Sequence, residues 1–358
     1  METGSPDPSC YFVHSPLLQN VRQVRLLRIV PVHTESLHPP VCQLDHFTLK
    51  YAPPYQAVSY TWGRQYDPMY HIFLNGRWYQ AKKNLYDFLC SFREVPENQN
   101  GCAYLWIDQI CINQTDLNER SNTVRFMSII YCQANFVITW LGNDADTVAA
   151  ARIFVHSKSS YSLLVLLNNR YFTRLWVIQE VLLAREVRVL CGNIWLSFSE
   201  LEIHTRAKGE EVYSRFRNPS YYLLWDSMYN RQGRDLAQCT SRYCANDCEN
   251  PRDKVYALLG LVKKEEHPIV NYGARITEVF IQTVRVLAKS EFRRRNEKTW
   301  VGQISYEETS LFLAREMYFS SKQQAKLQYF FSQLQGKEPD ETWYQTVWEG
   351  LSMDMHLG

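Results

Sequence analysis

The chain has 358 residues, of which 46% are hydrophobic and 14% aromatic, so it carries enough apolar surface to form a packed core. Its formal net charge is +2, and Lys and Arg are spread thinly along the sequence, which gives no electrostatic footprint for nucleic acid. The first residues form no signal peptide, and the longest apolar runs fall short of the roughly 20 residues that cross a bilayer. We therefore expect a soluble, cytoplasmic protein with neither a nucleic-acid nor a membrane partner.

The ten cysteines lie mostly inside apolar segments and lack the close, regular spacing of a disulfide scaffold. We interpret them as reduced thiols. Cys239, Cys244 and Cys248 follow His204, but the sequence contains no Cys-x-x-Cys pair and no His-x-x-x-His motif. We therefore predict no metal site and no bound cofactor.

The first hundred residues predict strands, a hairpin and one helix. Strands are expected over 24–32 and 56–62, the second running into a glycine turn. Asn75-Gly76 separates two strand-like runs within 71–79, and this dipeptide favours the positive φ angles of a tight hairpin. A helix is expected over 81–93, because its apolar residues recur on one helical face.

The following segment alternates between strands and helices. Buried strands are predicted over 104–108, 136–142 and 187–191, and the intervening segments are helical. The first of these helices begins at Asp116-x-x-Glu119, which resembles a capping box, and a later one covers 174–184. Repeated βαβ units predict a parallel sheet flanked by helices.

Beyond about residue 201 the strand pattern fades and the chain predicts helices. They are expected over 221–230, 254–262, 276–288 and 311–331. We therefore predict an α/β domain over 1–205, with the hairpin added near its N-terminus, and a mainly helical region over 206–358.

Four sequence blocks, in this order, resemble the HET (heterokaryon incompatibility) domain family. They are Tyr55–Gly63 (YQAVSYTWG), Leu105–Gln114 with Asn118–Arg120, Arg170–Glu180 (RYFTRLWVIQE), and Pro251–Gly260 (PRDKVYALLG). The resemblance covers residues 55–260. It implies a role in non-self recognition, in which the domain triggers cell death. Thr123 departs from the glutamine that the family often has after the Glu-Arg pair, and residues after about 290 match no pattern.

The order of elements is also similar to Toll/interleukin-1 receptor (TIR) domains, which implies a flavodoxin-like sheet. The corresponding features are Ser59-Tyr60 at the end of a strand, Asp108 closing the next, and Trp176-x-x-x-Glu180 on a later helix. In enzymatic members of that superfamily the helix glutamate cleaves the nicotinamide–ribose bond of NAD. The resemblance therefore implies an NAD glycohydrolase with Glu180 as its catalytic carboxylate and NAD as a substrate.

The residues themselves permit such a site. Breaking an N-glycosidic bond develops positive charge on the ribose, which a neighbouring carboxylate stabilises while aromatic rings hold the base. Ligands of open parallel sheets bind at the carboxyl ends of strands, where the first three blocks place their polar residues. The predicted binding residues are Tyr60, Trp62, Gly63, Asp108, Arg174 for a phosphate, and Trp176.

Structural roles remain open for each of these residues. Glu180 could form an ion pair, the tryptophans could belong to the core, and Asp108 could cap a turn. Glu119-Arg120 is expected to be solvated or locally paired. The main alternative function is a non-enzymatic interaction module, and a third is a paralogue without activity. Under either of the first two we expect self-association and a separate sensor protein.

Overall fold

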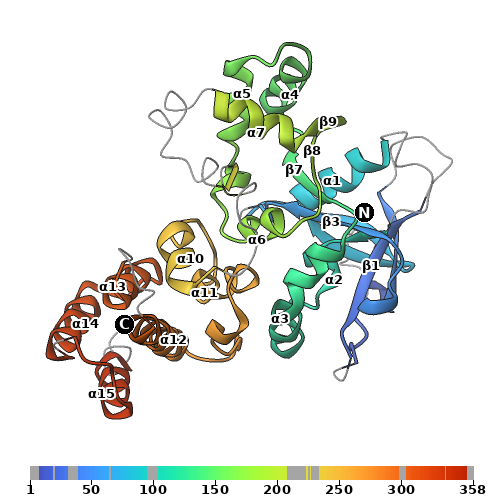
Figure 1. Ribbon diagram of the computed structural model, residues 1–358. Helices are drawn as coiled ribbons and strands as arrows, with labels where there is room; N and C mark the ends of the chain where they lie inside the picture. Colours follow the sequence, from blue (N-terminus) through green and yellow to red (C-terminus); the bar gives the residue numbers. More distant parts are fainter. Residues whose placement is uncertain are drawn as a thin grey trace. The chain divides into compact units, whose positions relative to one another are not determined.

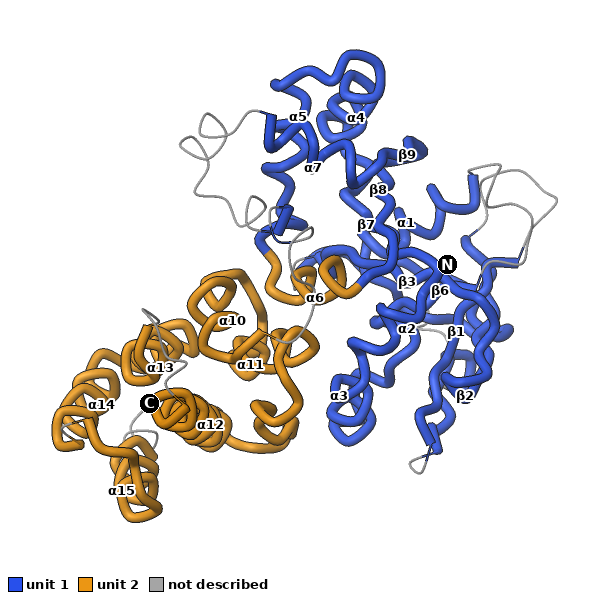
Figure 2. Tube along the Cα trace, viewed as in Figure 1, with its two compact units in different colours: residues 1–173, 184–227 blue, residues 174–183, 228–358 orange. Residues whose placement is uncertain are grey.

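The structure is a computed structural model that describes residues 8–18, 21–30, 39–63, 66–94, 104–207, 223–224, 226, 234–297, 304–334 and 336–352. The chain forms two compact units (Figure 2). The first unit comprises Met1–Thr173 and Ala184–Ser227, and the second comprises Arg174–Leu183 and Met228–Gly358. The predicted domain boundary after residue 205 stays a prediction.

The first unit is built on one nine-stranded sheet of order β5-β4-β2-β1-β6-β3-β7-β8-β9 (Figure 1). Its strands are β1 Gln23–Ile29, β2 Val41–Thr48, β3 Tyr55–Tyr60, β4 Met69–Leu74, β5 Arg77–Lys82, β6 Tyr104–Trp106, β7 Val137–Gly142, β8 Val187–Cys191 and β9 Ile194–Ser197. The predicted α/β class is confirmed, since helices flank this sheet and helices also form the C-terminal region.

The centre of the sheet is parallel. β3 pairs in parallel with β6 on one side and with β7 on the other, and β7 pairs in parallel with β8. Counted along the chain, these four strands have the order 2-1-3-4, which is the flavodoxin-like order. A central parallel strand is covered on both faces, which explains why these strands have near-continuous apolar runs. Ala57, Val58 and Ile138 are examples of their buried side chains.

The edges of the sheet are antiparallel, so the whole sheet is mixed. β1 pairs with β2, β4 with β5, and β8 with β9 in antiparallel fashion. The hairpin prediction is confirmed: Asn75 and Gly76, between β4 and β5, have φ angles of 50° and 76°. β2 and β9 were not predicted. β9 is only four residues long, and β2 (VCQLDHFT) has polar residues interspersed among its apolar ones, so neither produces a strong local pattern.

Helices of the first unit cover the sheet through apolar faces. They are α1 Lys83–Glu94, α2 Asp108–Cys111, α3 Leu117–Gln133, α4 Ala145–Ser157, α5 Ser160–Leu167 and α7 Phe198–Ala207. α1 buries the predicted face of Leu85, Phe88, Leu89 and Phe92, and Phe88 meets Trp140 of β7 edge-on at 5.7 Å. α4, α5 and α7 gather beside β8 and β9 (Figure 1).

Two local predictions in the first unit need correction. The strand predicted to close at Asp108 ends at Trp106, and Asp108 is the first residue of α2. Asp116 caps α3 as predicted, accepting from the N–H groups of Asn118 and Glu119, but the Glu119 carboxylate does not complete a capping box. It turns instead to the N–H of Asn113 and to a buried arginine.

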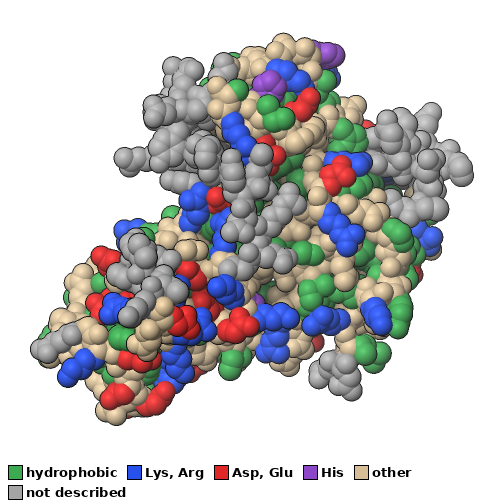
Figure 3. Space-filling model, in the orientation of Figure 1, with side chains coloured by type: hydrophobic (Ala, Val, Ile, Leu, Met, Phe, Trp, Pro, Cys, Tyr) green, Lys and Arg blue, Asp and Glu red, His purple; other side chains and the backbone are tan. Residues whose placement is uncertain are grey.

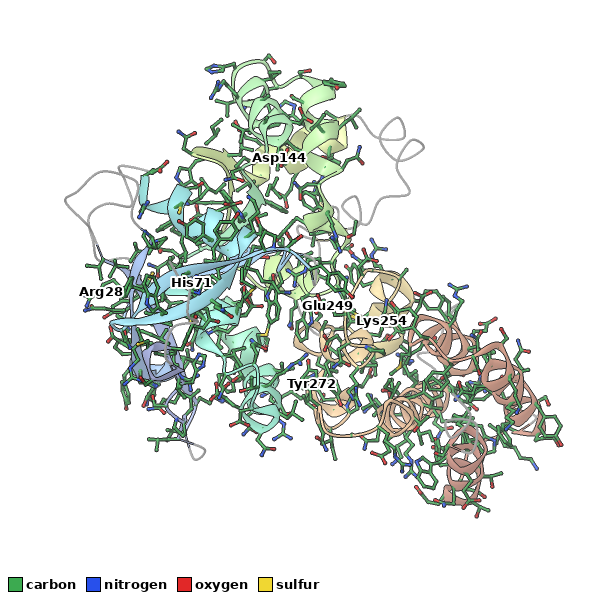
Figure 4. All side chains as sticks on the ribbon, turned by 180° about the vertical axis from the view of Figure 1, so that it is seen from behind. Arg28, His71, Asp144, Glu249, Lys254 and Tyr272 are labelled. Atoms are coloured by element: carbon green, nitrogen blue, oxygen red, sulfur yellow. The ribbon has the colours of Figure 1, made fainter. Side chains whose placement is uncertain are left out.

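Every regular element among the described residues of the second unit is helical. The α-helices are α6 Val177–Leu182, α10 Leu236–Tyr243, α11 Asp253–Tyr256, α12 Ile276–Asn296, α13 Tyr306–Glu316, α14 Ser321–Leu334 and α15 Glu341–Ser352, with short 3-10 helices at Leu259–Leu261 and Lys264–Glu266. Lys254 and Tyr272, labelled in Figure 4, both belong to this unit.

Several predicted helices of the second unit have different bounds. The helix expected over 174–184 is only α6, and the one over 254–262 divides into α11 and a 3-10 turn. The helix expected over 311–331 is two helices, broken where Tyr318 adopts a φ of 64°. α15 was not predicted, and the helix over 221–230 falls largely outside the described residues.

Charged side chains are mixed over the surface. On the face drawn in Figure 3, Lys and Arg alternate with Asp and Glu in both units. Within the part of the chain that the structure describes, no helix combines the length and apolar character needed to span a bilayer.

Candidate functional site

The carboxyl ends of β3 and β7 form the topological switch point of the parallel centre. The chain leaves the first parallel strand, β3, toward β6 on one side, and the third strand, β7, lies on the other side. Open α/β sheets bind ligands at this position, because the loops that follow the two strands diverge there. The predicted residues Tyr60, Trp62 and Gly63 lie on the last position of β3 and in the loop that follows it.

A side-chain bridge fixes the loop after β3. Nδ2 of Asn84, in the first turn of α1, donates to the carbonyl of Thr61 at 2.6 Å and to its hydroxyl at 2.9 Å. The side-chain oxygen of Asn84, Oδ1, accepts from Nε1 of Trp140 on β7 at 2.9 Å. Asn84 therefore ties together the ends of the two strands at the switch point.

Gly63 is required in this loop for two reasons. Its φ of +86° is rarely adopted by residues with a side chain, and a Cβ at this position would lie 2.6 Å from Oδ2 of Asp67. The tight turn therefore lets the Asp67 carboxylate lie directly against the backbone. Gly63 shapes the loop through its backbone.

Trp62 and Asp108 come together as predicted for one site. Nε1 of Trp62 donates to Oδ2 of Asp108 at 2.8 Å, and Oδ1 of the same carboxylate accepts from the N–H of Gln109 at 2.7 Å. The Lys82 ammonium lies over the Trp62 indole, 5.8 Å from its centroid. Trp62 is half-buried, and the hydrogen bond to Asp108 holds its ring by one edge.

Tyr60 reaches this group only indirectly. Its side chain is buried, with 2% of the residue exposed, and its hydroxyl donates to Oε1 of Gln109 at 3.1 Å. The Gln109 carbonyl accepts from the Tyr79 hydroxyl at 2.8 Å, so Gln109 is held from two directions. Its amide NH₂ has no hydrogen-bond partner among the described residues and is available as a donor.

A buried ion pair supports the segment that carries Asp108. Arg25 of β1, fully buried, forms a bidentate pair with Glu119 of α3, at 2.6 and 2.9 Å. Arg25 also donates to the carbonyl of Cys111, and Glu119 accepts from the N–H of Asn113. The expectation that Glu119 is solvated or locally paired is therefore wrong. Glu119 closes the loop between α2 and α3 against β1.

The third block contributes to the core of the first unit through Tyr171. Its hydroxyl lies 2.7 Å from that of Ser59 on β3 and 3.1 Å from that of Thr139 on β7, and all three side chains are buried. Buried hydroxyl groups that bond one another satisfy their own polar atoms. The Ser59 of the Ser-Tyr motif therefore has a structural role in joining the third block to the sheet.

The remaining predicted residues belong to the second unit. Arg174 forms an isolated β-bridge with Asp247. Nε1 of Trp176, at the N-terminus of α6, donates to Oδ2 of Asp253 at 3.0 Å, and the other oxygen of Asp253 accepts from the Tyr272 hydroxyl. This joins the third and fourth blocks, because Asp253 belongs to the latter.

Glu180 lies in the middle of α6 and is buried, with 2% of the residue exposed. Its N–H donates to the carbonyl of Trp176 at 3.3 Å, so the two residues stand one helical turn apart as predicted. The predicted residues thus form two groups, Tyr60, Trp62, Gly63 and Asp108 in the first unit and Arg174, Trp176 and Glu180 in the second. That Glu180 acts at the strand ends stays a prediction.

Sequence reasoning missed three residues of the first group. Gln109 directly follows Asp108 in the second block, so the block itself was the available signal. Asn84 and Lys82 gave none, because their approach to Thr61 and Trp62 depends on how the β4–β5 hairpin and α1 pack.

Burial makes five of the cysteines poorly reactive. Burial raises the pKa of the Cys42, Cys111 and Cys248 thiols to about 12, and burial also raises the pKa of Cys191 and Cys244. These thiols stay protonated near neutral pH and are poor nucleophiles. In the described ranges, no three or more His, Cys, Asp or Glu side chains are grouped to hold a metal ion.

The fold and the strand-end group define an α/β protein whose central parallel strands have the flavodoxin-like order. Residues 55–180 match the sequence model of the family described as heterokaryon incompatibility protein (HET), which confirms the resemblance drawn from the sequence blocks. The chain is similar to heterokaryon incompatibility protein 6, OR allele, of Neurospora crassa, with 25% identity over 355 aligned residues. That alignment covers 72% of this chain, which spans about half (52%) of the length of the relative. No solved structure is a significant match.

Proposed function

We propose that this chain is a HET-type effector in non-self recognition and cell-death signalling, and that it acts by hydrolysing the nicotinamide–ribose bond of NAD. The observation that carries the proposal is Glu180, a buried carboxylate on α6 at the last position of the HET match. The flavodoxin-like order of the parallel strands supports the likeness to TIR domains.

The chemistry assigned to Glu180 follows from charge. As the nicotinamide–ribose bond breaks, the ribose gains positive charge, and a carboxylate beside it lowers the barrier. Burial strengthens this interaction, because the local dielectric is low. We assign the binding of the substrate to Tyr60, Trp62, Gly63 and Asp108 at the strand ends, with Arg174 for a phosphate and Trp176 beside Glu180.

A non-enzymatic interaction module is the second candidate. It is favoured by hydrogen bonds through which residues of the sequence blocks stabilise the fold: Trp176 donates to Asp253, and the Ser59 and Tyr171 hydroxyls bond each other. In this alternative, Glu180 stabilises α6 and the protein signals by assembling with a partner. Under both candidates we propose a cytoplasmic protein that self-associates and answers to a separate sensor.

Release of nicotinamide tests the proposal. The purified chain, concentrated or clustered by a fused oligomerisation tag, is incubated with NAD, and the products are separated by chromatography. We expect turnover by the parent chain and a loss of about 10²-fold or more in Glu180→Gln, because this variant keeps the shape and loses the charge. Circular dichroism checks that the variant is folded.

The matched control is Glu186→Gln. Glu186 follows α6 closely in the chain, is exposed and pairs with Arg188 at 2.6 Å, so its loss removes a carboxylate without touching a buried one. Equal activity in the parent and Glu180→Gln would reject Glu180 as the catalytic carboxylate. No turnover by the folded, clustered parent would favour the interaction module.

A further inference from the structure

Lys82 brings a positive charge to the strand-end group from outside the sequence blocks. It is the last residue of β5, opposite Met69 in the hairpin, and the next residue begins α1. From there its Nζ reaches over the indole of Trp62, 5.8 Å from the centroid. The hairpin thus delivers an ammonium group to the loop that follows the first parallel strand.

The Lys82 ammonium has no ion-pair partner among the described residues. The neighbouring Lys83 pairs with Asp87 one turn further along α1. No carboxylate within the described ranges lies at ion-pair distance from Nζ of Lys82, whose side chain is half-buried. A partly desolvated ammonium whose only described contact is an aromatic face keeps most of its capacity to bind an anion.

The surroundings of Lys82 favour an anion at the same place. Asn84 binds Thr61, so the N-terminal turn of α1, a helix of 12 residues, lies at the end of β3. Unpaired N–H groups and the helix dipole give such a terminus a partial positive charge. The Asp108 carboxylate is directed elsewhere, since its oxygens accept from Trp62 and Gln109.

We propose that Lys82 binds a phosphate group of a nucleotide whose planar ring stacks at Trp62. The inference rests on the proposed function, because it takes the strand ends as the substrate site, and it assigns one phosphate of the proposed substrate to Lys82. The ammonium supplies the charge and the indole supplies the stacking surface.

The test compares two probes that differ only in a phosphate. Nicotinamide mononucleotide and nicotinamide riboside are titrated into the full chain by calorimetry, and chromatography verifies that both remain intact. We expect the mononucleotide to bind about 10- to 100-fold more tightly, which is the range for a hydrogen bond to a charged group. In Lys82→Gln this preference is lost, while binding of the riboside stays within about twofold.

Lys83→Gln is the matched control, since it removes the adjacent, already paired lysine and should keep the preference. The proposal is overturned if Lys82→Gln retains the parent's preference, if Lys83→Gln loses it equally, or if the parent binds neither probe. The assay reads binding and not turnover. If the preference depends on Lys82 but NAD is not hydrolysed, this inference stands and the glycohydrolase is rejected. If NAD is hydrolysed and Lys82→Gln changes neither hydrolysis nor the preference, the glycohydrolase stands and this inference is rejected.

Discussion

The two units contain the same chemical pair in different settings. In the first unit the Trp62 indole N–H donates to Asp108 at 2.8 Å, and in the second the Trp176 indole N–H donates to Asp253 at 3.0 Å. Trp62 is half-buried beside Lys82, and Asp108 shares its second oxygen with a backbone N–H. Asp253 is 4% exposed, and its second oxygen accepts a hydrogen bond from the Tyr272 hydroxyl.

This difference shows that a tryptophan–aspartate pair does not by itself define a site. In the second unit the aspartate is the enclosed partner: Asp253 is buried and accepts from the half-buried Trp176 and from the buried Tyr272. The pair in the first unit lies at the switch point of the sheet, with an ammonium and an amide donor beside it. We therefore expect Asp253 to matter for stability and Asp108 to matter for binding.

The largest effect is expected where the strand-end pair depends on the buried ion pair. Glu119→Ala leaves the Arg25 guanidinium buried without its carboxylate and frees the Asn113 N–H, which should cost about 3–5 kcal/mol of unfolding free energy. Denaturant titration of the full chain measures this cost. Glu200→Ala breaks the more exposed Lys158 pair and should change stability by no more than about 0.5 kcal/mol. Similar losses in both variants would show that the Arg25 pair is not a structural anchor.

The next effect separates the two tryptophan–aspartate pairs directly. Asp253→Ala removes an acceptor from the half-buried Trp176 indole and from the buried Tyr272 hydroxyl, so we expect a loss of about 2–4 kcal/mol of unfolding free energy. Hydrogen exchange should show the loosening in peptides covering α6 and α11. Asp253→Asn keeps one acceptor and should recover part of the loss. A cost below about 1 kcal/mol for Asp253→Ala would break the contrast drawn between the units.

Asp108→Ala should have a smaller effect on stability. Water can replace the carboxylate at the half-buried indole, so we expect a cost of about 1 kcal/mol together with a clear loss of nucleotide binding. The same calorimetric titration with nicotinamide mononucleotide measures the binding. If Asp108→Ala bound the probe normally and were as unstable as Asp253→Ala, Asp108 would be a structural residue like its counterpart.

The smallest effect is a pH dependence confined to the first unit. His14 donates to the Ile110 carbonyl, and His46 accepts from Nε of Arg25. Burial is the main reason that the pKa of each lies below the ordinary 6.5, and Arg25 also lowers both. The hydrogen bond to the Ile110 carbonyl, a larger effect than Arg25, raises the pKa of His14, and smaller effects of Ser15, Asp45 and Glu119 raise that of His46. The unfolded chain therefore takes up protons first as the pH falls, so stability should be constant above about pH 7.5 and decline below 6.5.

Denaturation midpoints at pH 7.5, 6.5 and 5.5 test this expectation. The double variant His14→Gln, His46→Asn should flatten the decline, and His156→Asn, at an exposed position, should leave it unchanged. A decline of the same size in the double variant would place the titrating groups elsewhere.

Local patterns predicted much of the first unit correctly. The Asn75-Gly76 turn, the buried face of α1, the cap at Asp116 and the central parallel strands depend on residues close together in the chain. Patterns also predicted that Trp62 and Asp108 would meet, because both follow parallel strands whose carboxyl ends share one edge. Errors gathered where short elements end, as at Asp108 and Tyr318, since helix and strand limits depend on packing as much as on propensity.

The sequence by itself determined the similarity of residues 55–180 to the HET family, the α/β order and the residues at the strand ends, because these depend on contiguous blocks and on local periodicity. Only the tertiary structure decided that Glu119 pairs with Arg25, that the Trp176 indole donates to Asp253, and that Lys82 lies over Trp62. These contacts join residues up to 94 positions apart. Their partners are chosen by burial and by the need to satisfy every enclosed polar group, and a linear pattern does not record that choice.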